Sequence, residues 1–169
     1  MARYSRRRLL GSLGLVTVGT LAGCSGTAAD ESADGSSTTS TDGSGTGLNL
    51  QEANVVGVEL TQQETAVEFA VTLHHDDEGE DGYANWWQVE TLDGSELGRR
   101  ELTHAHSSEP FTRSEPIEVP DDVDCVIVRG HDQTHGYGGQ AMLVSLGSGT
   151  TEGVDQGPEP DSFEGVDCP

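Results

Sequence analysis

The chain has 169 residues, with 30 aspartate and glutamate residues against 8 arginines and no lysine, and a formal net charge of −22. A surface this acidic repels phosphate backbones, so the composition excludes a nucleic-acid-binding protein. The same acidity is typical of proteins in concentrated salt, where screening shortens the reach of self-repulsion. We therefore expect a halophilic protein, and we assign the acidity to its environment rather than to a cationic ligand.

The N-terminal residues have the pattern of an export signal. Residues 5–10, SRRRLL, resemble a twin-arginine signal, and residues 21–24, LAGC, resemble the lipobox of lipoproteins. The apolar run between these two motifs is too short and glycine-rich for a membrane span. The sequence therefore predicts a signal peptide over residues 1–23 and lipidation of Cys24. That lipid would anchor the protein to the outer face of the cell membrane.

Composition divides the rest of the chain into three parts. Residues 24–47 are mainly serine, threonine, glycine and aspartate, which bury too little apolar surface to fold, and we expect a disordered tether. Residues 48–146 hold most of the apolar positions and have the size of one domain. Residues 147–169 are again acidic and glycine-rich, and we expect a flexible tail. The sequence thus predicts one folded domain between two flexible segments.

The domain has the apolar pattern of β-strands. Apolar and polar residues alternate with a period of two, most clearly in VEFAVTL at residues 67–73. Asp93 and Gly94 predict a tight hairpin, because this pair accepts the positive φ angles of such turns. The pattern predicts an all-β, seven-stranded antiparallel sandwich of immunoglobulin-like architecture, with a small barrel as the alternative. In chain order, the predicted strands are 54–60, 67–73, 86–91, 96–102, 111–119, 123–129 and 140–146.

The six histidines form three pairs, which lie at or just beyond the ends of the second, fourth and sixth predicted strands. If successive strands alternate in direction, these three ends lie at one pole of the domain. Neutral imidazole binds zinc and copper well, and several loops can contribute ligands to one ion. Nearby Asp76, Asp132 and Tyr137 are expected to support the ligands by hydrogen bonding. The sequence therefore predicts a Zn²⁺ or Cu²⁺ site formed by His74, His75, His104, His106, His131 and His135.

Other interpretations of this pole stay open. The histidines can be structural, with His131 bonded to a backbone carbonyl and His135 packed on Tyr137. A non-enzymatic interaction module would instead bind a protein or a glycan there through tyrosine and tryptophan. Of the neighbours Trp86 and Trp87, one is expected to face the core. A metal-dependent enzyme would also need an open coordination position and a base. The sequence has no nucleophile motif, so no catalytic residue is assigned.

Cys125 and Cys168 are the two cysteines that remain after Cys24. Outside the cell they can form a disulfide, which would tie the tail to the domain. Alternatively, Cys125 is a small buried apolar residue and Cys168 stays free in the tail. The local sequences do not resemble a CxxC-type metal or redox motif.

Several segments resemble a family of small exported domains found in haloarchaea and some bacteria. The resemblance lies within residues 74–146, about half of the chain. It implies a recurring exported domain, here in a haloarchaeal-type twin-arginine lipoprotein, and it implies no particular activity. The similar segments are HHDDEGEDGYANWW, LDGSELGRREL, HAH, PFTRS, VPDDVDCVIVRGHD and HGYGG.

Overall fold

The computed structural model describes residues 47–76, 79–160 and 162–169. The predicted signal peptide, Cys24 and the tether up to residue 46 lie outside the described residues, as do Asp77, Glu78 and Asp161. The described residues form eight strands and no helix, so none of them belongs to a helix that could cross a membrane.

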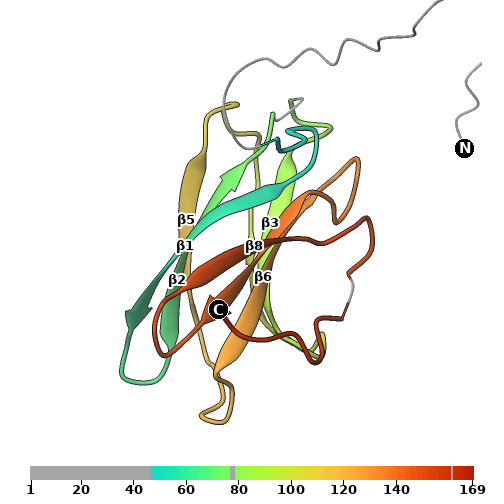
Figure 1. The fold of residues 1–169 in the computed structure, drawn as a ribbon. Helices are drawn as coiled ribbons and strands as arrows, with labels where there is room; N and C mark the ends of the chain where they lie inside the picture. The colour runs from blue at the N-terminus through green and yellow to red at the C-terminus, as the bar shows by residue number, and fades with distance from the viewer. Residues whose placement is uncertain (1–46, 77–78, 161) are drawn as a thin grey trace, which may run out of the picture. The chain divides into compact units, whose positions relative to one another are not determined.

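The strands form two antiparallel sheets that face each other (Figure 1). Sheet A has the order β1-β2-β5, and sheet B has the order β4-β3-β6-β7-β8. This confirms the predicted sandwich. The sheets have the immunoglobulin arrangement, which places the first, second and fifth strands in one sheet and the third, sixth and seventh in the other. The strands are β1 (Asn54–Gln62), β2 (Val67–His74), β3 (Ala84–Thr91), β4 (Glu96–Glu101), β5 (Phe111–Ile117), β6 (Cys125–Asp132), β7 (Gln140–Ser145) and β8 (Thr151–Asp155).

The count of seven strands is wrong, because β8 lies beyond residue 146 in the segment assigned to the tail. It pairs antiparallel with β7, from Gln140 opposite Asp155 to Val144 opposite Thr151. The sequence of β8, TEGVD, is mostly exposed and has a single large apolar residue. Hydrogen bonds to the edge of sheet B hold this strand, and hydrophobic periodicity does not report such bonds.

The main core lies between the two sheets. Many inward side chains of both sheets are fully buried there, among them Phe69, Leu73 and Trp87. Each such side chain contributes about 1.5–3 kcal/mol through burial. Trp86 points to the other face of sheet B, as expected for neighbours on a strand.

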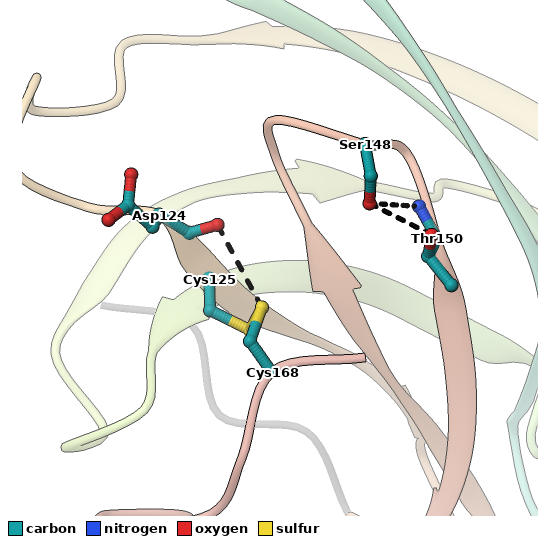
Figure 2. The surroundings of a disulfide bond; sticks show 5 residues. All are labelled: Asp124, Cys125, Ser148, Thr150 and Cys168. Atoms are coloured by element: carbon teal, nitrogen blue, oxygen red, sulfur yellow. Dashed lines mark hydrogen bonds between the residues drawn. A yellow bond between two sulfur atoms is a disulfide. The ribbon is translucent and has the colours of Figure 1, made fainter.

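A smaller apolar cluster lies on the outer face of sheet B. Ile127, Ala141 and Leu143 are buried in it, and Phe163 packs against them from the C-terminal segment. Cys168 in that segment forms a disulfide with Cys125 at the start of β6 (Figure 2). The C-terminal residues therefore cover part of this face.

Candidate functional site at the histidine pole

The loops that carry the histidines leave the same end of the sandwich, here called the histidine pole. Within each sheet, the strands that end at this pole are hydrogen-bonded to strands that begin there. A hydrogen bond from the Gln140 N–H to Asn54 Oδ1 (3.0 Å) joins the starts of β7 and β1 across the two sheets. The residue pairs that define the pole are Asn54 with His74, Ala84 with Asp132, and Trp86 with Glu101.

His75 and Asp132 form the buried part of the pole, with side chains 1% and 0% exposed. Asp132 Oδ1 accepts hydrogen bonds from the backbone N–H groups of Thr134 (2.8 Å) and His135 (2.6 Å). Asp132 Oδ2 lies 4.0 Å from His75 Nε2. The same nitrogen is 3.1 Å from the Gln51 carbonyl oxygen, which only accepts, so it carries a proton. These bonds hold the loop after β6 and the segment before β1.

His131 belongs to a group of aromatic rings on the outer face of sheet B. Its imidazole stacks on Trp86, with ring centroids 3.6 Å apart, and Tyr137 meets His131 edge-on at 4.9 Å. We call Trp86, His131 and Tyr137 the ring cluster. Asn85 Oδ1 lies 2.7 Å from His131 Nδ1 and fixes the imidazole orientation. The Arg99 guanidinium lies 4.8 Å from the Trp86 ring centroid and comes from β4, the strand on the other side of β3.

Burial lowers the pKa of His131, because desolvation disfavours its charged form. The Asp132 carboxylate acts in the opposite direction, and the Arg99 guanidinium adds to the lowering. His131 is therefore neutral at pH 7 and stacks on Trp86 as an uncharged ring.

His104 and His106 lie in the loop after β4 and form a separate stack. The His106 ring lies parallel to Phe111, with centroids 3.8 Å apart, and the His104 ring is 4.7 Å from His106. The Arg113 guanidinium lies 5.5 Å from the Phe111 ring centroid. These two histidines thus pack on each other and, through His106, on Phe111.

The predicted convergence of the loop histidines on a metal ion is not seen in the described part of the chain. No group of three or more His, Cys, Asp or Glu side chains is arranged there to hold a metal ion. Of the residues expected to support ligands, Asp132 holds a loop, Tyr137 packs on His131, and the Asp76 N–H donates to Leu50 (2.8 Å). The histidines divide into His75 with His135 around Asp132, His131 in the ring cluster, His104 with His106, and His74 at the end of β2.

A buried ion pair between Glu90 and Arg129 lies next to the ring cluster, and the sequence did not reveal which acid Arg129 meets or that the pair is buried. Arg129 Nε donates to Glu90 Oε2 at 2.8 Å, and the two side chains are 1% and 4% exposed. Gln88 Nε2 donates to Glu90 Oε1, and the Tyr137 hydroxyl donates to Gln88 Oε1 at 3.2 Å. One signal in the sequence could have indicated this pair: the polar residues Gln88 and Glu90 occupy alternate positions of one strand, so they lie on the same face. Part of the cover over this face comes from Phe163 in the distant C-terminal segment, which the strand pattern does not reveal.

One known relative is closely similar to this chain. The two are 64% identical over 135 residues, which are 79% of this chain and 67% of the relative, a "Putative lipoprotein" of Halomicrobium mukohataei. No family model matches the chain, and no solved structure matches it.

Proposed function

This chain belongs to the same family as the "Putative lipoprotein" of Halomicrobium mukohataei, and from that premise we propose that it is a lipid-anchored binding module outside the cell membrane. The lipobox-like residues 21–24 supply a cysteine, Cys24, of the kind that lipoproteins use for their anchor. The disulfide between Cys125 and Cys168 supports an extracytoplasmic location, because such bonds persist in oxidising compartments.

The ring cluster is the observation that carries the proposal of binding. Trp86 and Tyr137 are half-buried at the histidine pole, and Arg99 lies beside them. Tryptophan, tyrosine and arginine dominate the hot spots of protein interfaces, since they offer large contact areas. Packing against His131 and the bond to Asn85 hold the cluster in place before a partner arrives. Such preorganisation lowers the entropy lost on binding.

The surroundings of Trp86 favour a protein partner over a glycan. A sugar ring stacks on an open aromatic face, but His131 lies against one face of Trp86 and Arg99 approaches from the opposite strand. Val166 is the single exposed large hydrophobic residue among those described, so no broad apolar patch is offered. The expected interface is therefore polar and wet, with aromatic anchors, as in antibody recognition.

The Zn²⁺ or Cu²⁺ site that the sequence predicts is the less favoured function. Three of the predicted ligands, His106, His131 and His75, are each engaged in a different ring stack or hydrogen bond. Calorimetric titration with both ions in high salt compares the two functions. Binding tighter than about 1 mM, lost when His104, His106 and His131 are replaced together, would reverse our choice.

The anchor is tested by detergent phase partitioning of the protein made in a haloarchaeal host. The wild-type chain is expected in the detergent phase, and Cys24→Ser in the aqueous phase, because the variant has no thiol to acylate. Recovery of both proteins in the same phase would contradict the lipid anchor.

Binding is tested with the lipid-free protein on isolated cell envelopes. Trp86→Ala and Tyr137→Ala are each expected to weaken retention at least about tenfold, as for interface hot spots. Thr61→Ala, at the opposite pole, serves as the matched control and is expected to bind like the wild type. Treating the envelopes with protease is expected to abolish retention. Retention that survives protease but not glycan removal would assign a glycan partner instead.

A further inference from the structure

The C-terminal residues 162–168, here called the strap, lie over part of the outer face of sheet B. The side chains of that face are buried there, as they are in a protein core. Ile127 and Leu143 are fully buried beneath the strap and its neighbours, together with the ion pair of Glu90 and Arg129. The Phe163 ring lies 5.0 Å from the Arg129 guanidinium and closes this region from above. The strap therefore covers the Arg129 side of a buried charged pair.

The strap is held by the packing of Phe163 on the outer face of sheet B and by hydrogen bonds to Leu92. Its residues belong to no strand, and Phe163 N–H donates to the Leu92 carbonyl at 2.9 Å. The Ser162 hydroxyl donates to the same carbonyl at 3.4 Å. The disulfide from Cys168 to Cys125 then fixes the strap to the start of β6 (Figure 2). The histidine pole lies at the other end of this strand, at His131 and Asp132. The disulfide is thus the covalent bond that keeps the strap on sheet B.

Contacts run without interruption from the strap to the ring cluster. Phe163 lies against Arg129, which donates to Glu90. Gln88 donates to Glu90 and accepts a hydrogen bond from the Tyr137 hydroxyl. The Tyr137 ring in turn contacts both Trp86 and His131. A chain of contacts along one face of sheet B therefore joins the disulfide end of the domain to the ring cluster at the opposite pole.

We propose that the Cys125–Cys168 disulfide is a redox lock on the strap, and that its reduction changes the geometry of the ring cluster. This regulation rests on the proposed binding function of that cluster. A dithiol reductant supplies two electrons and two protons. One of its thiolates attacks a disulfide sulfur and releases the other as a thiolate, which is protonated. Its second thiolate then attacks the first reductant sulfur and displaces the remaining protein cysteine as a thiolate, so that Cys125 and Cys168 end as thiols and the reductant as a disulfide.

Release of the strap acts through the buried pair. Once water reaches Glu90 and Arg129, it can solvate each charge, so the ion pair separates at a lower cost in free energy. Glu90 then no longer holds Gln88 in one position, and Gln88 in turn releases the Tyr137 hydroxyl. The ring cluster loses one of the bonds that orient it.

Nuclear magnetic resonance of the indole and imidazole groups tests this coupling in the full chain, solubilised in detergent micelles. Reduction with dithiothreitol is expected to shift the Trp86 indole and His131 ring signals, while the signal of Trp87, buried in the main core, stays in place. Cleavage after Phe163 by a chymotrypsin-type protease is expected to become at least tenfold faster. Unchanged Trp86 and His131 signals with both cysteines reduced would overturn the proposal.

Two variants separate the coupling from general loosening. In Gln88→Leu, the link to Tyr137 is broken, so reduction is expected to speed cleavage but no longer to shift the Trp86 signal. A full shift in that variant would refute the path. If reduction unfolds the domain, which would move the Trp87 signal as well, Phe163→Leu keeps the disulfide and removes the ring. It is expected to shift the Trp86 signal, and no shift would refute the proposal. None of these measurements needs the partner, so they succeed or fail independently of binding.

Discussion

At the scale of single residues, two neighbouring side chains on one strand, Arg129 and His131, meet different surroundings. Arg129 is fully buried against Glu90 under the C-terminal segment, whereas His131 is half-buried in the ring cluster. Both point to the same face of sheet B, as the period of two requires. The difference arises from what lies above the sheet, and each residue leads to a specific expectation.

Removing one partner of the buried pair is expected to destabilise the protein strongly. Glu90→Gln removes the carboxylate that accepts from Arg129 Nε, and breaking a buried pair in this way costs about 3–5 kcal/mol. Adding Arg129→Met to that variant removes the remaining charge, so the double variant is expected to lose less than the sum of the single losses. Urea unfolding of the four proteins at one salt concentration measures this. Strictly additive losses would show that the two charges do not interact.

The lowered pKa of His131 predicts a dependence of stability on pH. The folded-state pKa lies below the unfolded value of about 6.5, so the unfolded chain binds the proton more readily. The contribution of neutral His131 is complete above the unfolded pKa and is lost as the pH falls toward the folded pKa. Between pH 7.5 and pH 5, the wild type should lose more stability in urea than His131→Gln, whose amide does not titrate. Equal losses would exclude this role for His131.

At the scale of elements, the strands follow the sequence closely where they bury one face, and less closely elsewhere. β2 alternates between buried and half-buried residues over its whole length, and its predicted span of 67–73 differs from the observed Val67–His74 by one residue. β6 continues to Asp132, three residues past its predicted end, because Gly130 and Asp132 are buried by neighbouring segments. Local pattern predicts a strand well when burial is itself periodic.

Packing of β6 against the segment before β1 predicts the effect of a single methyl group. A Cβ added at Gly130 would lie 2.4 Å from the backbone oxygen of Ala53, so one segment must move. Gly130→Ala is expected to cost at least about 2 kcal/mol, within the range for overpacked cores. At Gly147 an added Cβ would meet nothing within 4 Å, so Gly147→Ala is expected to stay within about 0.5 kcal/mol of the wild type. Equal thermal stability of the two variants would contradict this packing.

At the scale of the whole molecule, the disulfide connects the last residues to the middle of the fold. It spans a sequence separation of 43 residues, and closing such a loop in the unfolded chain is worth about 4 kcal/mol in the chain-entropy model. Cys168→Ser is therefore expected to lower the free energy of unfolding by up to about that amount. Ser162→Ala, a change in the same segment, should have little effect. A loss below about 0.5 kcal/mol for Cys168→Ser would show that the bond adds no stability.

The net charge of −22 leads to an expectation about salt. Lowering the ionic strength from 1 M to 0.1 M lengthens the screening distance from about 3 Å to about 10 Å. Repulsion among the carboxylates then reaches further and destabilises the compact state more than the extended one. The urea midpoint is expected to fall over this range, and a midpoint independent of salt would contradict the expectation.

The sequence by itself determined the all-β sandwich and the gathering of histidine-bearing loops at one pole. Both follow from local signals, because alternating burial, tight turns and alternating strand direction are properties of neighbouring residues. Only the tertiary structure decided where the imidazoles point. His75 turns inward to Asp132, whereas His131 turns outward to Trp86. Both directions are possible because side chains at the end of a strand can turn to either face of the sheet. It also decided that a segment far along the chain covers Glu90 and Arg129, because burial of an outward face depends on contacts distant in sequence.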